Sequence, residues 1–564
     1  MEDDSLAPFL VAAEAYPLPE GELDAHGATF LSCKHADKSA GTRVVLAWTP
    51  SYGTAGFRAN SAWLPSTVFR CGALMALRAM QTGKATGIVI TASHNPEQDN
   101  GVKLIDPNGG MMDMEWEKYA NDLAQGKDSQ GISTCIRKLL KEEDVLLGNH
   151  GKASVYIARD TRPSGEELVK AAVAGVTAFS VQVCHLGILT TPQAHFIVQS
   201  ANIGRSTSEK AYFEQLTSGA NGLIEDRSTR TEMEPLLVDC ANGVGALKLK
   251  ELMEGLAGIS VRLCNVGHGA LNHLVGADYV QKERTIPLGI SEEDAQGRCA
   301  SIDGDADRLV YFTRAANGTL ELFDGDKIAT LAAIFIKDLI SELPPVVQRD
   351  FSVGVVQTAY ANGASTFFMK ESLCLDVALT PTGVKHLHAK AEQYDIGIYF
   401  EANGHGTVLF SSTFISGMKQ LDTSPARKFL HLHNIINQTV GDALSGILMV
   451  EVILMLKGWS LQDWGAVYED LPSRQLKVKV EDRTRIQTSC AETRCISPPG
   501  LQEEIDKIVA QVERGRAFVR PSGTEDVVRI YAEASDQKSA DWLALNIAHA
   551  THQLAGGVGP PPSS

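Results

Sequence analysis

The sequence predicts an α/β protein of several domains, built on mixed, mainly parallel sheets. The chain has 564 residues. This is too long for one hydrophobic core, and a typical size of about 150 residues per domain suggests roughly three or four domains. Short apolar runs alternate with longer helical stretches along most of the chain. Such alternation is typical of repeated α/β units, in which helices join parallel strands.

Seven apolar runs are the predicted strands of these units. They cover residues 87–91, 154–158, 181–187, 235–239, 308–312, 353–357 and 396–400. The C-terminal part has a different pattern, with alternating segments at 475–480 and 527–534 and a helix near 537–554. This pattern predicts a smaller α+β domain at the end of the chain.

Other stretches predict a buried helix, two loops and a disordered end. The apolar run 444–456 is interrupted by Glu451. It falls short of the ~20 residues that a bilayer span needs, so it should form a buried helix. The polar stretches 201–231 and 483–500 are predicted loops or inserts, and the Gly/Pro/Ser tail from Gly556 should be disordered.

Charge and cysteine content narrow the classes of partner. A net charge of −17 argues against nucleic acid or an anionic membrane, since both require a basic face. Ten cysteines without a CxxC pair favour free thiols in a reducing compartment, which we expect to be the cytoplasm. The acidic start and the short apolar stretch 7–13 do not resemble a secretory signal.

The segment "TASHNP", residues 91–96, directly follows the first predicted strand and presents Ser93 at its end. It could simply stop the strand, because Asn95–Pro96 favours a turn. A nucleophilic serine is the alternative. Ser93 is not part of a GxSxG elbow, which weakens the case for a serine hydrolase.

The segment "SIDGDADRLVYF" places Asp303, Asp305 and Asp307 at alternate positions before a strand. Carboxylates this close repel unless a cation lies among them, and oxygen ligands suit a hard cation such as Mg²⁺. An EF-hand loop would need Gly and Glu where this chain has Arg308 and Arg314. A solvated acidic turn remains the alternative to a magnesium site.

Two later segments contain groups suited to a phosphorylated sugar. In "VRPSGTEDVVRIYAEA", Arg520, Ser522, Thr524 and Arg529 surround a turn, and guanidinium forks with hydroxyls could clamp a phosphate. In "YFEANGHG", Glu401, Asn403 and His405 alternate. If the backbone there is extended, all three would point the same way and could meet the hydroxyls of one sugar.

Several other polar residues are open to more than one interpretation. Lys385 follows a Gly turn in "TPTGVKHLH", and its two histidines have no further ligand at zinc spacing. Arg58, Lys103, Arg159 and Arg162 would each by itself be solvated or structural. The chain has no Walker A motif, because Leu146 stands where its first glycine would be.

Taken together, four ordered motifs resemble the α-D-phosphohexomutase superfamily: "TASHNPEQDNGVKL", "DGDADR", "EANGHG" and "RPSGTED". They look most like those of the members that act on N-acetylglucosamine phosphate. The resemblance runs from about Tyr52 to about Gly557. It implies an isomerase of four domains around a central cleft, the first three being related α/β units.

The resemblance also implies a role for each matching residue. Ser93 would carry a phosphoryl group and hold one Mg²⁺ per chain together with Asp303, Asp305 and Asp307. Arg58, Lys103 and Arg308 would stabilise charge near the transferred group, with Lys103 or His405 as proton-transfer partner. Sugar and phosphate binding would fall to Lys385, Glu401, Ala402, Asn403, His405, Arg520, Pro521, Ser522, Gly523, Thr524 and Arg529.

The reaction implied is the interconversion of N-acetylglucosamine 6-phosphate and N-acetylglucosamine 1-phosphate, a step of UDP-N-acetylglucosamine biosynthesis. It would proceed through phosphoserine, with the sugar 1,6-bisphosphate as intermediate and activator. The alternatives are a phosphoglucomutase, a phosphoglucosamine mutase or, in another class, a non-catalytic sugar-phosphate sensor. We expect a cytoplasmic monomer whose only partner is a small sugar phosphate. The expected domains cover residues 1–190, 191–297, 298–457 and 458–564. The turn before Lys385 has Pro381 where the family more usually has a basic residue. Whether this turn contacts a phosphate is therefore not settled by the resemblance.

Overall fold

The computed structural model describes residues 6–18, 49–53, 55–148, 151–225, 233–522 and 526–563. The chain forms two compact units. Unit 1 comprises Met1–Leu322 and Leu430–Leu456, and unit 2 comprises Phe323–Phe429 and Lys457–Ser564. Within the described ranges, no helix is both long enough and apolar enough to span a bilayer. The nine cysteines in these ranges are free thiols.

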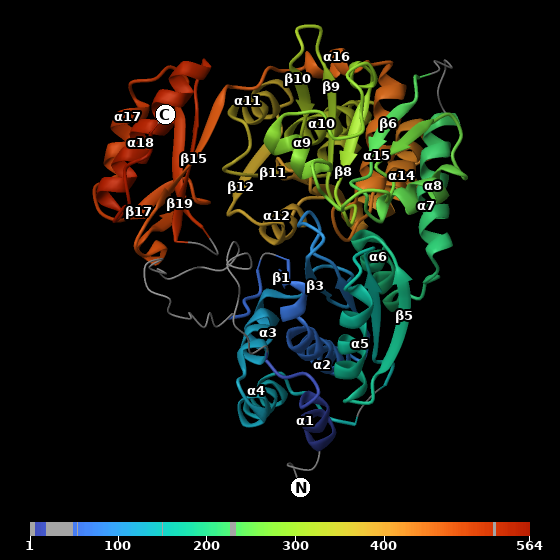
Figure 1. The fold of residues 1–564 in the computed structure, drawn as a ribbon. Coiled ribbons are helices and arrows are strands. Elements are labelled where there is room, and N and C mark those ends of the chain that lie inside the picture. The colour runs from blue at the N-terminus through green and yellow to red at the C-terminus, as the bar shows by residue number, and fades with distance from the viewer. Residues whose placement is uncertain are drawn as a thin grey trace. The chain divides into compact units, whose positions relative to one another are not determined.

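The first sheet of unit 1 has the strand order β1-β3-β2-β4-β5. Figure 1 labels β1, β3 and β5 of this sheet. β2, β4 and β5 are parallel, whereas β3 is antiparallel to both β1 and β2. The strands are β1 Phe57–Asn60, β2 Ala85–Ile90, β3 Asp99–Ile105, β4 Ser154–Arg159 and β5 Gln182–Ile188. The helices are α1 Ala7–Ala13, α2 Pro65–Thr82, α3 Met114–Gln125, α4 Ser129–Glu142, α5 Gly165–Thr177 and α6 Thr191–Asn202.

Helices cover both faces of this sheet. Ile88 of β2 belongs to an apolar core shared with α2 and α5, while a Cβ on neighbouring Gly87 would meet Val198 of α6. Because successive residues of a strand point to opposite faces, α6 lies on the face opposite α2 and α5. α2 and α5 approach closely through two glycines: a Cβ on Gly175 would lie 1.9 Å from the Phe69 carbonyl oxygen, and one on Gly72 would meet the backbone of α5.

The apolar stretch near the start of the chain is part of the same core. It forms α1, and its buried Phe9 packs against Phe69 and Phe179, with ring centroids 5.3 and 5.2 Å apart. The stretch is therefore apolar because it packs into the hydrophobic core of unit 1.

The second sheet of unit 1 has the order β10-β9-β8-β6-β7, with β6 parallel to β7 and β8, and β9 antiparallel to β8. Its strands are β6 Leu236–Asp239, β7 Val261–Cys264, β8 Cys299–Ile302, β9 Leu309–Arg314 and β10 Leu320–Phe323. The helices of this region are α7 Glu209–Glu225, α8 Gly245–Met253, α9 Ala277–Glu283, α14 Ser424–Ile435 and α15 Ala443–Lys457.

The predicted buried helix is confirmed as α15, in which every residue from Ala443 to Met455 is buried. The charge within it, Glu451, accepts hydrogen bonds from Arg298 at 2.7 Å and Tyr311 at 3.2 Å. Burial raises the pKa of Glu451, and the Arg298 guanidinium opposes that rise. A paired carboxylate can be buried at a far smaller cost than an isolated one.

Unit 2 contains a four-stranded sheet of order β12-β11-β13-β14, with β11 parallel to β12 and β13, and β14 antiparallel to β13. Its strands are β11 Val353–Thr358, β12 Asp376–Thr380, β13 Ile396–Phe400 and β14 Gly406–Phe410. The helices are α10 Gly325–Ser341, α11 Gly363–Phe367, α12 Val384–Ala391, α13 Ser412–Gln420 and α16 Leu461–Gly465.

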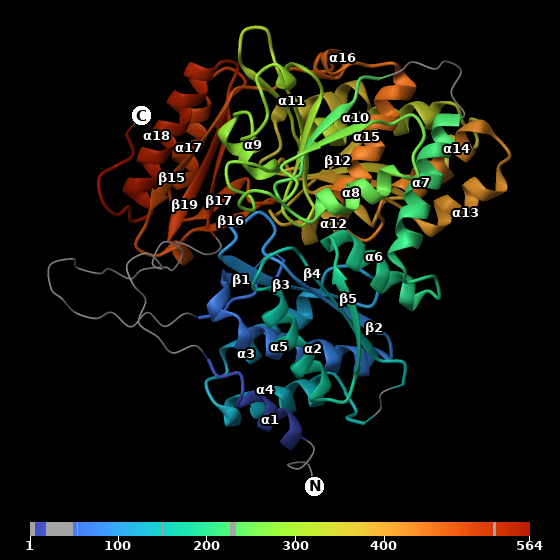
Figure 2. The ribbon, with the colours of Figure 1, turned by 45° about the vertical axis from the view of Figure 1, so that its right-hand side comes forward.

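The C-terminal part of unit 2 is the predicted α+β region (Figure 2). An antiparallel sheet of order β15-β19-β18 packs against α17 and α18, and β16 and β17 form a separate hairpin. The elements are β15 Ser473–Lys479, β16 Gln487–Ser489, β17 Arg494–Ser497, α17 Leu501–Val509, β18 Arg516–Pro521, β19 Val527–Glu533 and α18 Gln537–Leu554.

The structure differs from the sequence-based predictions in four places. The stretch predicted as a loop at 201–231 contains α7, and the second one, 483–500, contains β16 and β17. The tail is ordered from Gly556 to Ser563, where Val558 donates to the Lys479 carbonyl and His549 contacts that of Pro562. β8 and β9 belong to the same sheet as β6. The loop of Asp303 to Asp307 therefore connects two strands of the second sheet, whereas the predicted domain 298–457 would have placed it at the start of a third domain.

Candidate functional site

Ser93 lies three residues beyond the end of β2, in a conformation that is unusual for serine. Its φ is 50°, in the left-handed region, and its side chain is buried. The Thr91 hydroxyl accepts a hydrogen bond from the Ser93 N–H at 3.0 Å, and the carboxylate of Asp160 accepts one from Thr91 at 2.7 Å. A strained residue held by several contacts is typical of functional sites.

Two side chains from other parts of unit 1 hold the backbone around Ser93. The amide nitrogen of Asn272 donates to the carbonyls of Ser93 and Asn95 at 2.8 and 2.9 Å. The buried guanidinium of Arg162 donates to the same two carbonyls at 3.3 and 2.7 Å and pairs with Asp160. Neither Arg162 nor Asn272 lies in a local motif with Ser93, so the sequence alone indicates no specific role for either residue.

Replacing Asn272 with glycine is expected to lower kcat/KM about tenfold, because the serine loop loses two partly buried hydrogen bonds that orient it. Asn272 itself has φ 56°, so glycine keeps the backbone while removing the side chain. Steady-state kinetics and thermal unfolding measure the two effects. Unchanged activity in a variant of normal stability would exclude this orienting role.

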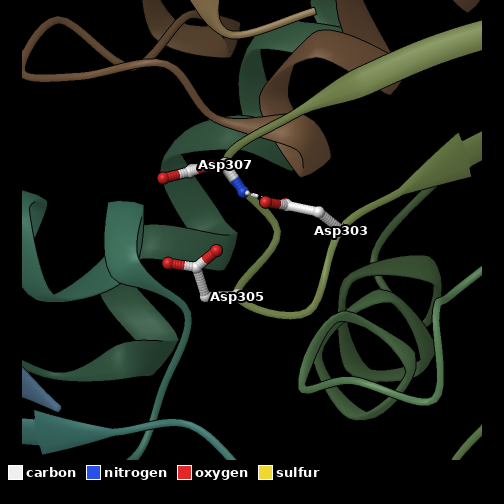
Figure 3. Close-up of side chains that lie close together, drawn as sticks. All are labelled: Asp303, Asp305 and Asp307. Atoms are coloured by element: carbon white, nitrogen blue, oxygen red, sulfur yellow. Dashed lines mark hydrogen bonds between the residues drawn. The ribbon is translucent and has the colours of Figure 1, made fainter. Parts of the chain in front are cut away.

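The three aspartates converge in the loop between β8 and β9 (Figure 3). One carboxylate oxygen from each lies within 4.8 Å of the others, and all three residues are buried. Asp303 accepts hydrogen bonds from the backbone N–H groups of Asp307 and Arg308 at 3.0 and 3.1 Å, which fixes the turn. The alternative of a solvated acidic turn is therefore wrong.

The cluster has the properties of a site for a hard cation. Among the described residues, Oδ2 of Asp303 and Oδ1 of Asp305 are buried without a hydrogen-bond partner. Burial, together with the neighbouring carboxylates of Asp307 and Asp305, raises the pKa of Asp303 well above its usual value. Unsatisfied carboxylate oxygens this close together fit a divalent cation such as Mg²⁺.

Ser93 lies directly beside this cluster. Its hydroxyl donates to Asp305 at 3.2 Å and accepts a hydrogen bond from Arg58 of β1 at 3.3 Å. A Cβ on Gly304, within the acidic loop, would come within 2.6 Å of the Ser93 carbonyl oxygen, so glycine is required for this close approach. The two motifs that sequence analysis singled out thus form one site.

Lys103 adds positive charge to the same site. From β3, it pairs with Asp305 at 2.7 Å and Asp307 at 2.6 Å. Burial lowers the pKa of Lys103, but the two carboxylates outweigh this and raise it overall. Arg308 lies 3.9 Å from Asp303 and is bonded more closely to Asp278, at 2.9 Å.

In unit 2, the sugar-loop candidates lie in a tight turn between β13 and β14. Asn403 accepts from the His405 N–H at 2.9 Å and donates to Glu401 at 3.3 Å. The Ala402 carbonyl accepts from Gly325 at the start of α10. The backbone is therefore not extended, and the spacing argument that aligned Glu401, Asn403 and His405 is wrong, although the turn still brings the three together.

The two phosphate-clamp arginines lie directly opposite one another on β18 and β19. Val519 and Ile530 belong to the apolar cluster with α17 and α18, so Arg520 and Arg529 point to the other face, by the two-residue period of strands. Like charges placed directly opposite each other are destabilising unless anions compensate them. Glu492 accepts a hydrogen bond from Arg520 at 2.7 Å, and a bound phosphate could accept from both guanidiniums. The pair therefore fits a phosphate site.

The structure describes some of the remaining predicted phosphate- and sugar-binding residues but not all of them. Pro521 and Ser522 end β18 and continue from it, whereas Gly523 and Thr524 lie outside the described residues. Lys385 is in the first turn of α12, just after the turn of Pro381 to Gly383. Thr382 in that turn donates to Glu492, and Glu492 also accepts from Arg520, a link that the sequence did not indicate.

Comparison with known proteins gives consistent matches along the chain. Residues 324–459 match the family model described as phosphoacetylglucosamine mutase AMG1, domain III. Residues 476–550 match the C-terminal domain of phosphoglucomutase/phosphomannomutase, and residues 72–131 and 132–206 match domain I of that family. The models for domains I, III and IV thus match in the order that the resemblance implied.

Individual relatives match over nearly the whole length. The phosphoacetylglucosamine mutase of Arabidopsis thaliana is 45% identical, over 99% of this chain and 100% of the relative. The Aspergillus fumigatus N-acetylphosphoglucosamine mutase, solved with GlcNAc-6P and magnesium, has a TM-score of 0.84 at 41% identity, covering 90% of this chain and 96% of that one. A variant solved with glucose 1,6-bisphosphate has a TM-score of 0.86 at 39% identity, over 98% and 99% of the two chains.

Proposed function

This chain belongs to the phosphoacetylglucosamine mutase family, and from that premise we propose that it interconverts N-acetylglucosamine 6-phosphate and N-acetylglucosamine 1-phosphate. The single observation that carries the proposal is the Ser93 hydroxyl, buried and bonded to both Asp305 and Arg58 beside three clustered carboxylates. This arrangement provides an oxygen that can carry a phosphoryl group, with charge to stabilise its transfer.

The proposed cycle has two phosphoryl transfers. In the first, the phosphate on Ser93 passes to the C1 hydroxyl of the 6-phosphate, giving the 1,6-bisphosphate and a free Ser93 hydroxyl. The bisphosphate then turns, and the Ser93 oxygen takes the 6-phosphoryl group while the C6 oxygen leaves and gains a proton. The product is N-acetylglucosamine 1-phosphate, and Ser93 is phosphorylated again.

Residues of unit 1 stabilise charge in these transfers. Arg58 donates a hydrogen bond to the Ser93 oxygen, so it can stabilise that oxygen as a leaving group. Lys103 holds Asp305 and Asp307 in place through two short ion pairs. Asp303, Asp305 and Asp307, with an oxygen of the Ser93 phosphate, would hold Mg²⁺, which when bound would withdraw charge from the transferred group.

Unit 2 is proposed to recognise the sugar and the phosphate that is not reacting. The opposed guanidiniums of Arg520 and Arg529 provide charge-assisted hydrogen bonds to that phosphate. Glu401 and His405 present polar groups to the sugar, while both ends of the Asn403 amide are already bonded within the turn. Asn403 therefore shapes the loop, and its replacement should affect acetylated and plain sugars alike.

The substrate assignment is tested by comparing two sugars. We expect kcat/KM for N-acetylglucosamine 6-phosphate to exceed that for glucose 6-phosphate at least ~10-fold, because a site shaped for the acetyl group leaves polar groups unpaired when it is absent. Coupled assays on both substrates measure this ratio. Equal values would favour a phosphoglucomutase, and no turnover of either would favour a sugar-phosphate sensor.

Two finer predictions about the protein belong to the same proposal. We keep a cytoplasmic location, supported by the free thiols of the described cysteines. We also propose that the protein is a monomer. Fractionation and light scattering test these two points.

A further inference from the structure

Glu492 occupies a strained turn next to the phosphate clamp of unit 2. It lies in the hairpin turn between β16 and β17, where Cys490, Ala491 and Glu492 all have positive φ, of 51°, 55° and 66°. Non-glycine residues are disfavoured in the left-handed region, because Cβ crowds the following carbonyl oxygen, so three in succession strain the turn. Backbone strain of this kind persists only where surrounding contacts hold it.

The contacts that hold Glu492 involve both of its carboxylate oxygens. One accepts a hydrogen bond from Nε of Arg520 at 2.7 Å. The other accepts from the N–H and the hydroxyl of Thr382, at 2.8 and 2.6 Å. Both charged side chains are largely shielded from solvent, being 17% and 20% exposed for Glu492 and Arg520. The ion pair is therefore stronger than one on an open surface.

We propose that Glu492 is a positioning residue for phosphate binding, which fixes Arg520 and ties the clamp to the turn before α12. The proposal rests on the function proposed above, since it assigns the phosphate of the sugar substrate to Arg520. The bond to Glu492 uses Nε of Arg520 rather than either terminal nitrogen, and Tyr360 is a second side chain that interacts with the guanidinium. The pairing with Glu492 therefore does not itself occupy the two nitrogens that we assign to the phosphate. A guanidinium already held at one edge loses less conformational entropy when it binds an anion at the other.

A second role for the same carboxylate would be that of a competitor, which occupies Arg520 until a phosphate displaces it. The geometry favours positioning. Glu492 would keep its two bonds to Thr382 if it lost Arg520, and its backbone is confined by the strained turn. A carboxylate built to be displaced would need room and freedom to move, which these contacts deny it.

The link also explains how a turn without a basic residue at Pro381 can contribute to phosphate binding. Thr382 follows Pro381 and donates to the carboxylate that holds Arg520, and Lys385 follows in the first turn of α12. The turn therefore acts on the phosphate through Glu492 and Arg520. The same contacts fix the start of α12 relative to the clamp.

Replacing Glu492 with alanine tests the proposal. We expect KM for N-acetylglucosamine 6-phosphate to rise about tenfold with kcat within about twofold, because Arg520 loses its orientation but not its charge. Thr382→Val, which keeps the Glu492–Arg520 pair and removes only one bond, should raise KM about two- to threefold. Glu513→Ala is the matched control, since it removes the same charge from an exposed position of the same region.

Calorimetric titration of each variant with N-acetylglucosamine 6-phosphate gives a readout independent of turnover. Weaker binding in Glu492→Ala, with binding by Glu513→Ala unchanged, is the expected result. Equal or tighter binding in Glu492→Ala would overturn the proposal, and tighter binding would identify Glu492 as a competitor. Absence of mutase turnover in the parent protein would instead contradict the proposed function, while the titration would still test Glu492.

Discussion

Replacing Ser93 with alanine is expected to reduce mutase turnover at least about a thousandfold while leaving sugar-phosphate binding within a few-fold of normal. The variant lacks the oxygen that accepts and donates the phosphoryl group. The groups proposed to bind the sugar and its phosphate, such as Arg520 and Arg529, are untouched. A coupled assay measures turnover, and calorimetry measures binding of the 6-phosphate.

Ser206→Ala is a suitable control, because Ser206 is exposed between α6 and α7 and bonds only to Ser208 among the described residues. It should behave like the parent in both measurements. Near-normal turnover by purified Ser93→Ala would rule out the phosphoserine mechanism. Loss of binding as well as turnover would show that the substitution had disturbed more than the acceptor oxygen.

Replacing Asp305 with asparagine is expected to lower kcat at least about a hundredfold and to weaken Mg²⁺ binding, with a smaller effect on KM. Asp305 contributes charge to the carboxylate cluster and also accepts hydrogen bonds from Ser93, Thr191 and Lys103. An amide of the same shape can retain some of these bonds but removes the negative charge. Kinetics across a magnesium titration separates the loss of metal affinity from the loss of rate.

Chelation provides the second test of the metal site. Removing divalent cations from the parent with EDTA should abolish turnover, and added Mg²⁺ should restore it. Asp422→Asn, at a fully exposed residue paired only with Arg427 in the described structure, should leave both responses unchanged. Full activity of the parent in EDTA would contradict the role assigned to the three aspartates.

The strands of the α/β units were predictable because their apolar runs are local in sequence. The run at 396–400 coincides with β13, and that at 353–357 matches β11 except for its last residue. The stretch 201–231 was misjudged, because its polar and glycine-rich composition hides the buried face of α7, formed by residues such as Tyr212 and Leu216. Packing of that face outweighs the loop-like local composition and favours the helix, and a window of sequence does not show such packing.

The site was predictable where its chemistry lies in a short motif. Asp303, Asp305 and Asp307 were identified from their spacing, and the structure brings Ser93 into hydrogen-bond contact with Asp305. Their mutual placement depends on contacts between segments far apart in the chain. Arg58 and Lys103, each unremarkable in its own segment, gain their significance only from that folding.

Residues that orient the site by hydrogen bonds from distant parts of the chain could not be predicted from short sequence motifs. Asn272 holds the Ser93 loop from a position 179 residues later, and Glu492 reaches Thr382 across 110 residues. Both are ordinary polar residues in ordinary turns. Nothing in their neighbours distinguishes them, and only the folded arrangement of donors and acceptors reveals their partners.

The most direct test of the account is to follow the phosphoryl group itself. The protein is labelled by incubation with radioactive glucose 1,6-bisphosphate, separated from it, and mixed in a rapid-quench instrument with unlabelled N-acetylglucosamine 6-phosphate. The account predicts one labelled phosphate per chain, located on Ser93 by mass spectrometry, that passes to the sugar at least as fast as steady-state turnover. Turnover without labelled Ser93, or release of the label more slowly than kcat, would contradict it.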